Sequence, residues 1–206
     1  KNTNKLIKQC NKFIINKKNN IKLKKKNCID INNILNLAEG LGISLLNFRR
    51  DFYLNSKSYK NHYLSSSKYK KLIYNLHNLN RENKYSFIIS LSHCPHKILL
   101  NRNIEKNINS IGGCSAGIIS IHITENGNFV PCMPLRDIIL GNIRKNKLKI
   151  LWSKNEILIK LRNREKNLKG KCGKCKYILS CGGCRADAYF IKKDLFEEDS
   201  SCFMEE

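Results

Sequence analysis

Four cysteines crowd into one short segment, CGKCKYILSCGGC, and constrain the fold more than any other feature of the chain. They are separated in turn by two, five and two residues and are Cys172, Cys175, Cys181 and Cys184. Three of the remaining six flank this segment: Cys114, Cys132 and Cys202. Thiols this closely spaced are typical of metal ligands. We therefore expect the C-terminal half of the chain to fold around bound metal.

The redox environment decides between disulfides and metal. The N-terminal residues KNTNKLIKQCNK are polar and do not resemble a signal peptide, and no apolar run approaches the length of a membrane span. We therefore expect a cytoplasmic chain without a membrane partner. In that reducing compartment, clustered cysteines bind metal or act in redox chemistry more often than they form disulfides.

The spacing favours iron–sulfur clusters over zinc. A zinc ribbon separates its two Cys-x-x-Cys knuckles by about 15 to 20 residues, whereas only KYILS lies between Cys175 and Cys181. In two-cluster ferredoxins, a close run of cysteines gives its first three thiols to one cluster and its fourth to another. We expect the same division here, with Cys184 binding a second cluster.

The stretch from Gly113 to Cys202 resembles the SPASM domain, the auxiliary-cluster extension of radical S-adenosylmethionine (radical SAM) enzymes. The landmarks that carry the resemblance occur in the order of that domain: GCSAG at 113–117, ENGNFVPC at 125–132, LGNI at 140–143, Leu151–Trp152, LRN at 161–163, LKGKCGKC at 168–175, CGGCRADAY at 181–189 and EEDSSC at 197–202. Their combination is most similar to the branch with the alternative haem-synthesis and haem d1 enzymes. That branch also contains maturases of ribosomally made peptides.

The resemblance implies one or two auxiliary [4Fe–4S] clusters. One ligand set comprises Cys172, Cys175, Cys181 and Cys202, and the other comprises Cys114, Cys132 and Cys184. The second set is one ligand short of four. Its last iron is either open to substrate or water, or bound by a ligand foreign to the family such as Cys94. We prefer the open position, because family members differ here and open positions are how metal sites bind substrates.

Residues around the cysteines have predicted structural roles. Asn126-Gly127 stands between the alternating runs IISIHI and NFVPC, which predicts a β-hairpin that brings Cys114 close to Cys132. Gly182 and Gly183 allow the backbone to turn between two ligands.

Three larger side chains in this region have alternative interpretations. Arg185 either balances cluster charge or is a surface arginine that starts a helix through RADAYFIKK. Trp152 is expected to be a packing anchor rather than a substrate platform. His122 is expected in the core or on a hairpin face rather than as a ligand.

The N-terminal half predicts alternating helices and strands. CIDINNILNLAEGLG predicts a helix with Asp30 near its start and a stop at Gly40 or Gly42, followed by a strand in SLLNF. LSSSKYKKLIYNLHNLN predicts a helix with a serine N-cap, followed by the strand YSFIISLS. KFIIN at 12–16 is a candidate earlier strand. The predicted fold class is α/β, and this order resembles the late part of a radical SAM β/α barrel.

Two domains are therefore predicted: residues 1–112 as the late portion of the barrel and residues 113–206 as the SPASM domain. The C-x-x-x-C-x-x-C motif of the radical SAM catalytic cluster occurs nowhere in the chain. In the family, reductive cleavage of S-adenosyl-L-methionine at that cluster makes a 5′-deoxyadenosyl radical. The chain alone is thus expected to be inactive. It is expected to be a fragment, a split subunit or a gene remnant, and the intact set of seven thiols argues against the last. RRDFYLNSKSY replaces the family's usual Gly-Arg pair, so Arg49 and Arg50 receive no cofactor role.

The formal charge of +23 raises the question of nucleic-acid binding. The lysines are scattered among asparagines and isoleucines in runs such as KKNNIKLKKK, which we interpret as a solvated face. Nucleic acid is not expected as a partner. The same positive field would attract a polycarboxylate tetrapyrrole or an acidic peptide.

The leading hypothesis is the C-terminal portion of a radical SAM/SPASM oxidoreductase whose auxiliary clusters transfer electrons or bind substrate during modification of a tetrapyrrole, as in haem biosynthesis, or of a peptide. Its expected partners are the missing N-terminal half or a chain that supplies it, and a reduced flavodoxin- or ferredoxin-type donor. The alternatives are a stand-alone iron–sulfur electron-transfer module and a zinc-stabilised basic interaction module. No catalytic residue is marked by spacing.

Overall fold

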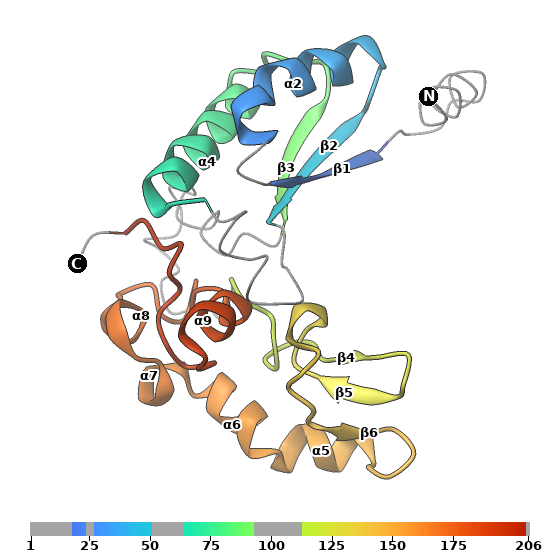
Figure 1. The fold of residues 1–206 in the computed structure, drawn as a ribbon, viewed down its shortest axis with the longest axis vertical. Helices are drawn as coiled ribbons and strands as arrows, with labels where there is room; N and C mark the ends of the chain where they lie inside the picture. The colour runs from blue at the N-terminus through green and yellow to red at the C-terminus, as the bar shows by residue number, and fades with distance from the viewer. Residues whose placement is uncertain (1–17, 24–26, 51–63, 93–112, 205–206) are drawn as a thin grey trace. The chain divides into compact units, whose positions relative to one another are not determined.

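A computed structural model describes residues 18–23, 27–50, 64–92 and 113–204 and divides the chain into two compact units (Figure 1). The described residues of the first unit are 18–23, 27–50 and 64–92, and those of the second are 113–204. The predicted boundary after residue 112 adjoins residues outside these ranges, so its position stays a prediction.

The first unit is a three-stranded parallel sheet with connecting helices. Its elements in chain order are β1 (Lys18–Leu23), the 3-10 helix η1 (Asn27–Asp30), α2 (Ile31–Gly40), β2 (Leu45–Arg50), α4 (Ser66–Arg81) and β3 (Ile88–Ser92). The strands lie side by side in sequence order, and Phe48 in β2 is in register with Ile21 in β1 and Leu91 in β3. Strand–helix–strand connections of one hand place successive helices on the same face of a sheet, and Figure 1 shows α2 and α4 together on one face.

Hydrophobic periodicity explains both helices. Helix α2 buries Ile31, Leu35 and Ala38, one residue per turn. Helix α4 buries a similar stripe, which comprises Tyr69, Leu72, Ile73, Leu76 and Leu79. The predictions of both helices, and of the strands that follow them, are confirmed. Ser65 occupies the N-cap position of α4, but its side chain makes no capping hydrogen bond.

Strand β1 corrects the interpretation of the lysine-rich segment. Its six residues KNNIKL belong to the run that we assigned to a solvated face, yet they pair in parallel along the whole of β2. Only one side of the strand faces solvent, because exposed residues alternate with less exposed ones and Leu23 is buried. Only two apolar residues alternate with the lysines and asparagines of this segment, so the sequence gives a weak signal for a strand.

The candidate strand at 12–16 lies outside the described residues.

The second unit combines a small antiparallel sheet with short helices. Its elements are β4 (His122–Ile123), β5 (Asn128–Val130), the 3-10 helix η4 (Met133–Leu135), β6 (Gly141–Asn142), α5 (Leu148–Lys154), α6 (Glu156–Arg162), α7 (Arg164–Asn167), α8 (Gly170–Lys174) and α9 (Arg185–Lys192). Strands β4 and β5 form the predicted hairpin. Its turn is closed by a 2.8 Å hydrogen bond from the Gly127 amide to the Thr124 carbonyl.

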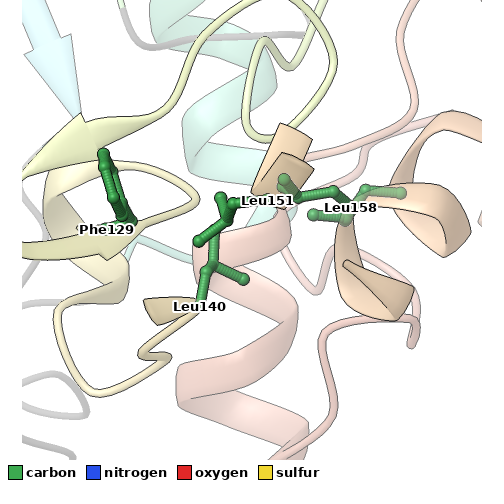
Figure 2. Close-up of a cluster of buried hydrophobic side chains, with 5 residues drawn as sticks. Phe129, Leu140, Leu151 and Leu158 are labelled. Carbon is green, nitrogen blue, oxygen red and sulfur yellow. The ribbon is translucent and has the colours of Figure 1, made fainter. Parts of the chain in front are cut away.

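A leucine-rich core holds the sheet of this unit against its helices. Figure 2 shows Phe129 of β5, Leu140, Leu151 of α5 and Leu158 of α6 together, and Leu161 completes the buried cluster. Trp152 packs against this cluster and is half-buried, as its predicted role of packing anchor requires. The predicted helix through RADAYFIKK is α9, which begins at Arg185.

No helix in the described part of the chain is long and apolar enough to cross a membrane.

We predict that the Leu158→Ala substitution lowers the free energy of unfolding by about 2–5 kcal/mol, because the Leu158 side chain is fully buried and its loss leaves a cavity. The matched control is Ile159→Ala in the same helix. Ile159 is 38% exposed, so its loss should cost about 1 kcal/mol or less. Denaturant unfolding of the two variants of this chain checks this. Equal losses would contradict the assignment of Leu158 to the core.

Candidate metal centre

One group of cysteines converges at helix α8 and the C-terminal segment. Cys172 lies within α8, and Cys175 is the residue at which that helix ends. Cys181 packs with Tyr177, and Cys175 packs against both. The Cys202 amide donates a 3.0 Å hydrogen bond to the Asp199 carbonyl, and the Asp199 amide donates to the Cys172 sulfur at 3.4 Å. The fold thus brings the C-terminal segment to the Cys172 knuckle.

Burial raises the pKa of three of these thiols, those of Cys172, Cys181 and Cys202. Burial raises the pKa of Cys181, and Asp199, Cys202 and Cys172 add to the increase. The pKa of Cys202 rises to about 11, again first through burial, with Asp199 and Cys172 as further causes. Burial is also the largest cause of the raised pKa of Cys172. Ionisation of Cys172 would therefore disfavour ionisation of both Cys181 and Cys202.

Backbone amides point at several of the sulfurs. Tyr177 donates its N–H to the Cys175 sulfur at 3.4 Å. The amide of Gly183 hydrogen-bonds the Cys181 thiol, and the amide of Met204 hydrogen-bonds that of Cys202. Such bonds favour the charged thiolate over the thiol, and they tune the reduction potential of a metal that the thiolate binds.

A second group contains Cys114 and Cys132. The pKa of Cys132 is raised to about 12, first by burial and next by the charge of Cys114, so the two thiols lie within electrostatic range of each other. The β4–β5 hairpin lies between these two cysteines in the chain, and its role in bringing them together stays a prediction. A turn precedes the hairpin, in which the amides of Ile118 and Ile119 both donate to the Ser115 carbonyl.

The two groups adjoin each other through the backbone. The Cys114 amide donates a 3.0 Å hydrogen bond to the Cys181 carbonyl. This bond places Cys114 beside the loop that carries Cys184, the third predicted member of its set. The Cys184 amide in turn donates to the Asp199 carboxylate at 2.7 Å, and Cys184 is buried as the N-cap of α9.

Gly182 and Gly183 lie between the ligands of the two predicted sets, and both have positive φ, at +64° and +57°. A Cβ atom on Gly183 would lie 3.0 Å from the Cys172 sulfur and 2.8 Å from the Asp199 Cβ. The prediction that this turn requires glycine is confirmed, and close packing adds a second reason.

Arg185 is a buried residue of the site, so the surface interpretation is wrong. It is 2% exposed, and its guanidinium donates to the carbonyls of Leu195 and Glu197 at 2.9 and 2.7 Å. Its Nη2 lies 3.7 Å from the Cys172 sulfur. The alternative, a cation beside the thiol group, agrees with this geometry.

Three further buried ionisable residues were missed by sequence reasoning. Asp199 accepts from the Cys184 and Ser201 amides, and Asp187 accepts from the Ser200 amide and the Ser201 hydroxyl. Arg164 is 3% exposed and begins α7. Asp187 and Asp199 fall within the resemblance landmarks and Arg164 directly follows one, but no spacing marked them as buried.

Two other predicted residues have simple outcomes. His122 is exposed on the face of the hairpin, one of the two positions that we expected for it. Cys94, the alternative fourth ligand, lies outside the described residues.

Among residues 18–23, 27–50, 64–92 and 113–204, no three His, Cys, Asp or Glu side chains are arranged to hold a single metal ion. An iron–sulfur cluster makes a different demand, because its thiolates bind separate iron atoms. The donor chemistry fits that demand: thiols in two groups, amides directed at their sulfurs, and a buried guanidinium beside one of them.

Comparison with known proteins agrees with this chemistry. Residues 114–176 match the SPASM family, described as an iron–sulfur cluster-binding domain. The AdoMet-dependent heme synthase of Methanosarcina barkeri is 28% identical over 197 residues, which cover 89% of this chain and 54% of that protein. The pre-heme d1 synthase of Dinoroseobacter shibae is 28% identical over 50% of this chain and 26% of its own length. The chain thus spans about half or less of these relatives.

Solved structures share the fold. Streptococcus suis SuiB bound to its precursor peptide SuiA matches 98% of this chain and 48% of its own chain, with a TM-score of 0.70 and 18% identity. The enzyme anSMEcpe with bound AdoMet matches 89% of this chain and 51% of its own, with a TM-score of 0.62 and 18% identity. The mixed α/β fold is that of radical SAM/SPASM enzymes, as the resemblance predicted.

We predict that the affinity of the thiol groups for a thiophilic metal rises with pH. Cys132 and Cys202, with pKa values of about 12 and 11, are protonated near neutral pH and must release protons when they bind metal. Each released proton raises the apparent affinity for Co(II) about tenfold per pH unit between about pH 6.5 and 8.5. Anaerobic titrations followed by thiolate-to-cobalt absorption check this, with Cys202→Ser expected to reduce the slope. A pH-independent affinity would show that these thiols are already ionised near neutral pH and would contradict the prediction.

Proposed function

Because residues 114–176 match the SPASM domain and the chain has the fold of radical SAM/SPASM enzymes, we propose that it is the C-terminal portion of such an enzyme. Its second unit then holds auxiliary iron–sulfur clusters. The observation that carries this proposal is that Cys172, Cys175, Cys181 and Cys202 lie in one region of that unit, with the Cys114 amide hydrogen-bonded to the Cys181 carbonyl. S-adenosyl-L-methionine and its cleavage belong to the complete enzyme, because the chain contains no C-x-x-x-C-x-x-C motif.

We assign one cluster to Cys172, Cys175, Cys181 and Cys202, and a second to Cys114, Cys132 and Cys184. The packing of Cys175 against the Tyr177–Cys181 pair supports the first set, as does the effect of Cys172 on the pKa values of Cys181 and Cys202. The proximity of Cys114 to Cys132 supports the second. We leave the last position of the second set open to substrate or water.

Protein groups around the thiols would prepare the site for its cofactor. When bound, the clusters supply one-electron transfer or a Lewis-acidic position for substrate. The amides of Tyr177, Gly183 and Asp199 stabilise thiolate charge, and Arg185 adds a cation beside Cys172. The buried positions of Cys172, Cys181 and Cys184 keep water from the ligands.

The proposed substrate is a tetrapyrrole. The relative that aligns with 89% of this chain is named AdoMet-dependent heme synthase, and the positive charge of the chain suits a polycarboxylate. A peptide is the second candidate, because the fold also matches SuiB bound to its precursor peptide. A reduced flavodoxin- or ferredoxin-type donor in a reducing cytoplasm completes the proposal.

We predict about eight irons and eight sulfides per chain after anaerobic reconstitution, since each [4Fe–4S] cluster contributes four of each. The paired substitutions Cys172→Ser with Cys181→Ser, and separately Cys114→Ser with Cys132→Ser, should each remove about four irons. Cys28→Ser is the matched control, because Cys28 lies in the first unit, and should keep all eight. Stoichiometric zinc without sulfide would instead favour the basic interaction module.

A second prediction tests whether the chain is part of a larger enzyme. Reduced with dithionite and given S-adenosyl-L-methionine, the loaded chain should form no 5′-deoxyadenosine, because the ligands of the cleaving cluster are absent from its sequence. Chromatography of the reaction measures this, with a complete radical SAM enzyme as positive control. Formation of 5′-deoxyadenosine would show that a cluster of this chain cleaves the cofactor and would contradict the auxiliary assignment.

A further inference from the structure

Arg164 contacts the backbone of both cysteine groups. Its Nη2 donates to the carbonyl of Cys114, a member of one proposed ligand set. Its Nη1 donates at 2.7 Å to the carbonyl of Leu179 and at 3.4 Å to that of Ile178, both in the loop between Cys175 and Cys181 of the other set. One guanidinium therefore joins the two ligand loops.

The turn between the two sets packs directly on this guanidinium. A Cβ atom on Gly182 would lie 2.7 Å from the Arg164 Cζ and 2.8 Å from its Nε. Gly182 lies between Cys181, of one proposed set, and Cys184, of the other. The absence of a side chain at Gly182 is thus what allows the guanidinium to reach both loops.

The positive charge of Arg164 is buried where negative charge would gather. Arg164 is 3% exposed. Burial lowers the pKa of its guanidinium, while the charges of Cys114 and Cys181 raise it, one from each set. Arginine remains charged under ordinary conditions, and a buried cation acts on its neighbours with little screening by salt.

We propose that Arg164 is a positioning residue that links the two auxiliary clusters and raises the reduction potential of both. This inference rests on the proposed function, since it concerns clusters held by the two thiol sets. A cluster that accepts one electron becomes more negative, so a fixed cation between the sites stabilises the reduced state of each. Because one side chain serves both ligand loops, its effects on the two sites occur together.

A buried anion on the same loops should act in the opposite direction. Asp199 accepts from the Cys184 amide at 2.7 Å and donates its own amide to the Cys172 sulfur, so it too contacts members of both sets. Its negative charge disfavours the reduced clusters. Substitutions that neutralise Arg164 and Asp199 should therefore shift the reduction potentials in opposite directions.

The chain offers a matched control for Arg164. Arg162 stands two positions earlier, and its Nη2 donates to the Trp152 carbonyl at 2.6 Å while its guanidinium lies 5.0 Å from the centre of the Trp152 ring. These partners belong to α5 rather than to a cysteine loop. Loss of this arginine removes the same charge and the same type of hydrogen bond from the α5–α6 contact.

The test is an anaerobic redox titration with dithionite, followed by EPR, of the reconstituted full chain. We expect Arg164→Gln to make both midpoint potentials more negative by about 59 mV. This shift corresponds to a decrease of about tenfold in the equilibrium constant of one-electron reduction. Arg164→Lys keeps the charge and should shift them less. Asp199→Asn should move both in the positive direction, and Arg162→Gln should leave them unchanged.

Iron content separates the possible outcomes. If Arg164→Gln loads fully but neither potential moves, or only one does, the inference is overturned while the proposed function stands. If both Arg164 variants lose iron from both sets while Arg162→Gln loads fully, the structural link is supported. Iron loss from a single set would overturn it. A wild-type chain that binds no iron would overturn the proposed function and this inference together.

Discussion

The burial of thiols in close groups is the constraint on which the second unit depends. Isolated thiols can be buried like small apolar side chains, but grouped thiols that must ionise repel one another and resist the loss of their protons. Burial is the largest cause of the raised pKa values of Cys132, Cys181 and Cys202, and neighbouring thiols raise these pKa values further. A metal that accepts the thiolates offsets this cost, so metal binding and folding should be linked in this unit. The amides that point at the sulfurs reduce the same cost from the protein side.

Charged side chains complete this arrangement and explain why the ligand loops lie where they do. Arg164 and Arg185 place guanidinium groups beside the loops. Asp187 accepts from the Ser200 amide of the C-terminal segment, and Asp199 of that segment accepts from the Cys184 amide. All four side chains are nearly inaccessible to solvent. Buried charges are costly unless they are paired or hydrogen-bonded. Their number in one small region indicates a site whose charge must be balanced rather than an ordinary hydrophobic core.

Much of this could be predicted from the sequence, for physical reasons. The helices of the first unit have apolar stripes of the right period, and Asn126-Gly127 is a strong hairpin signal, so those elements were expected. The close spacing of the cysteines is by itself enough to indicate metal. Strand β1 was not predicted, because its alternating apolar residues are only two and stand among lysines and asparagines. The burial of Arg164 and Asp199 could not be predicted, because it depends on contacts with loops that are distant in the sequence.

The proposed function requires that two separate sets of cysteines in this unit each hold an iron–sulfur cluster. Anomalous scattering at the iron edge, measured from crystals of the anaerobically reconstituted chain, tests it most directly. We expect two iron-containing peaks, one surrounded by Cys172, Cys175, Cys181 and Cys202 and the other by Cys114, Cys132 and Cys184. A single peak shared by all the cysteines, or a peak at the zinc edge alone, would contradict it.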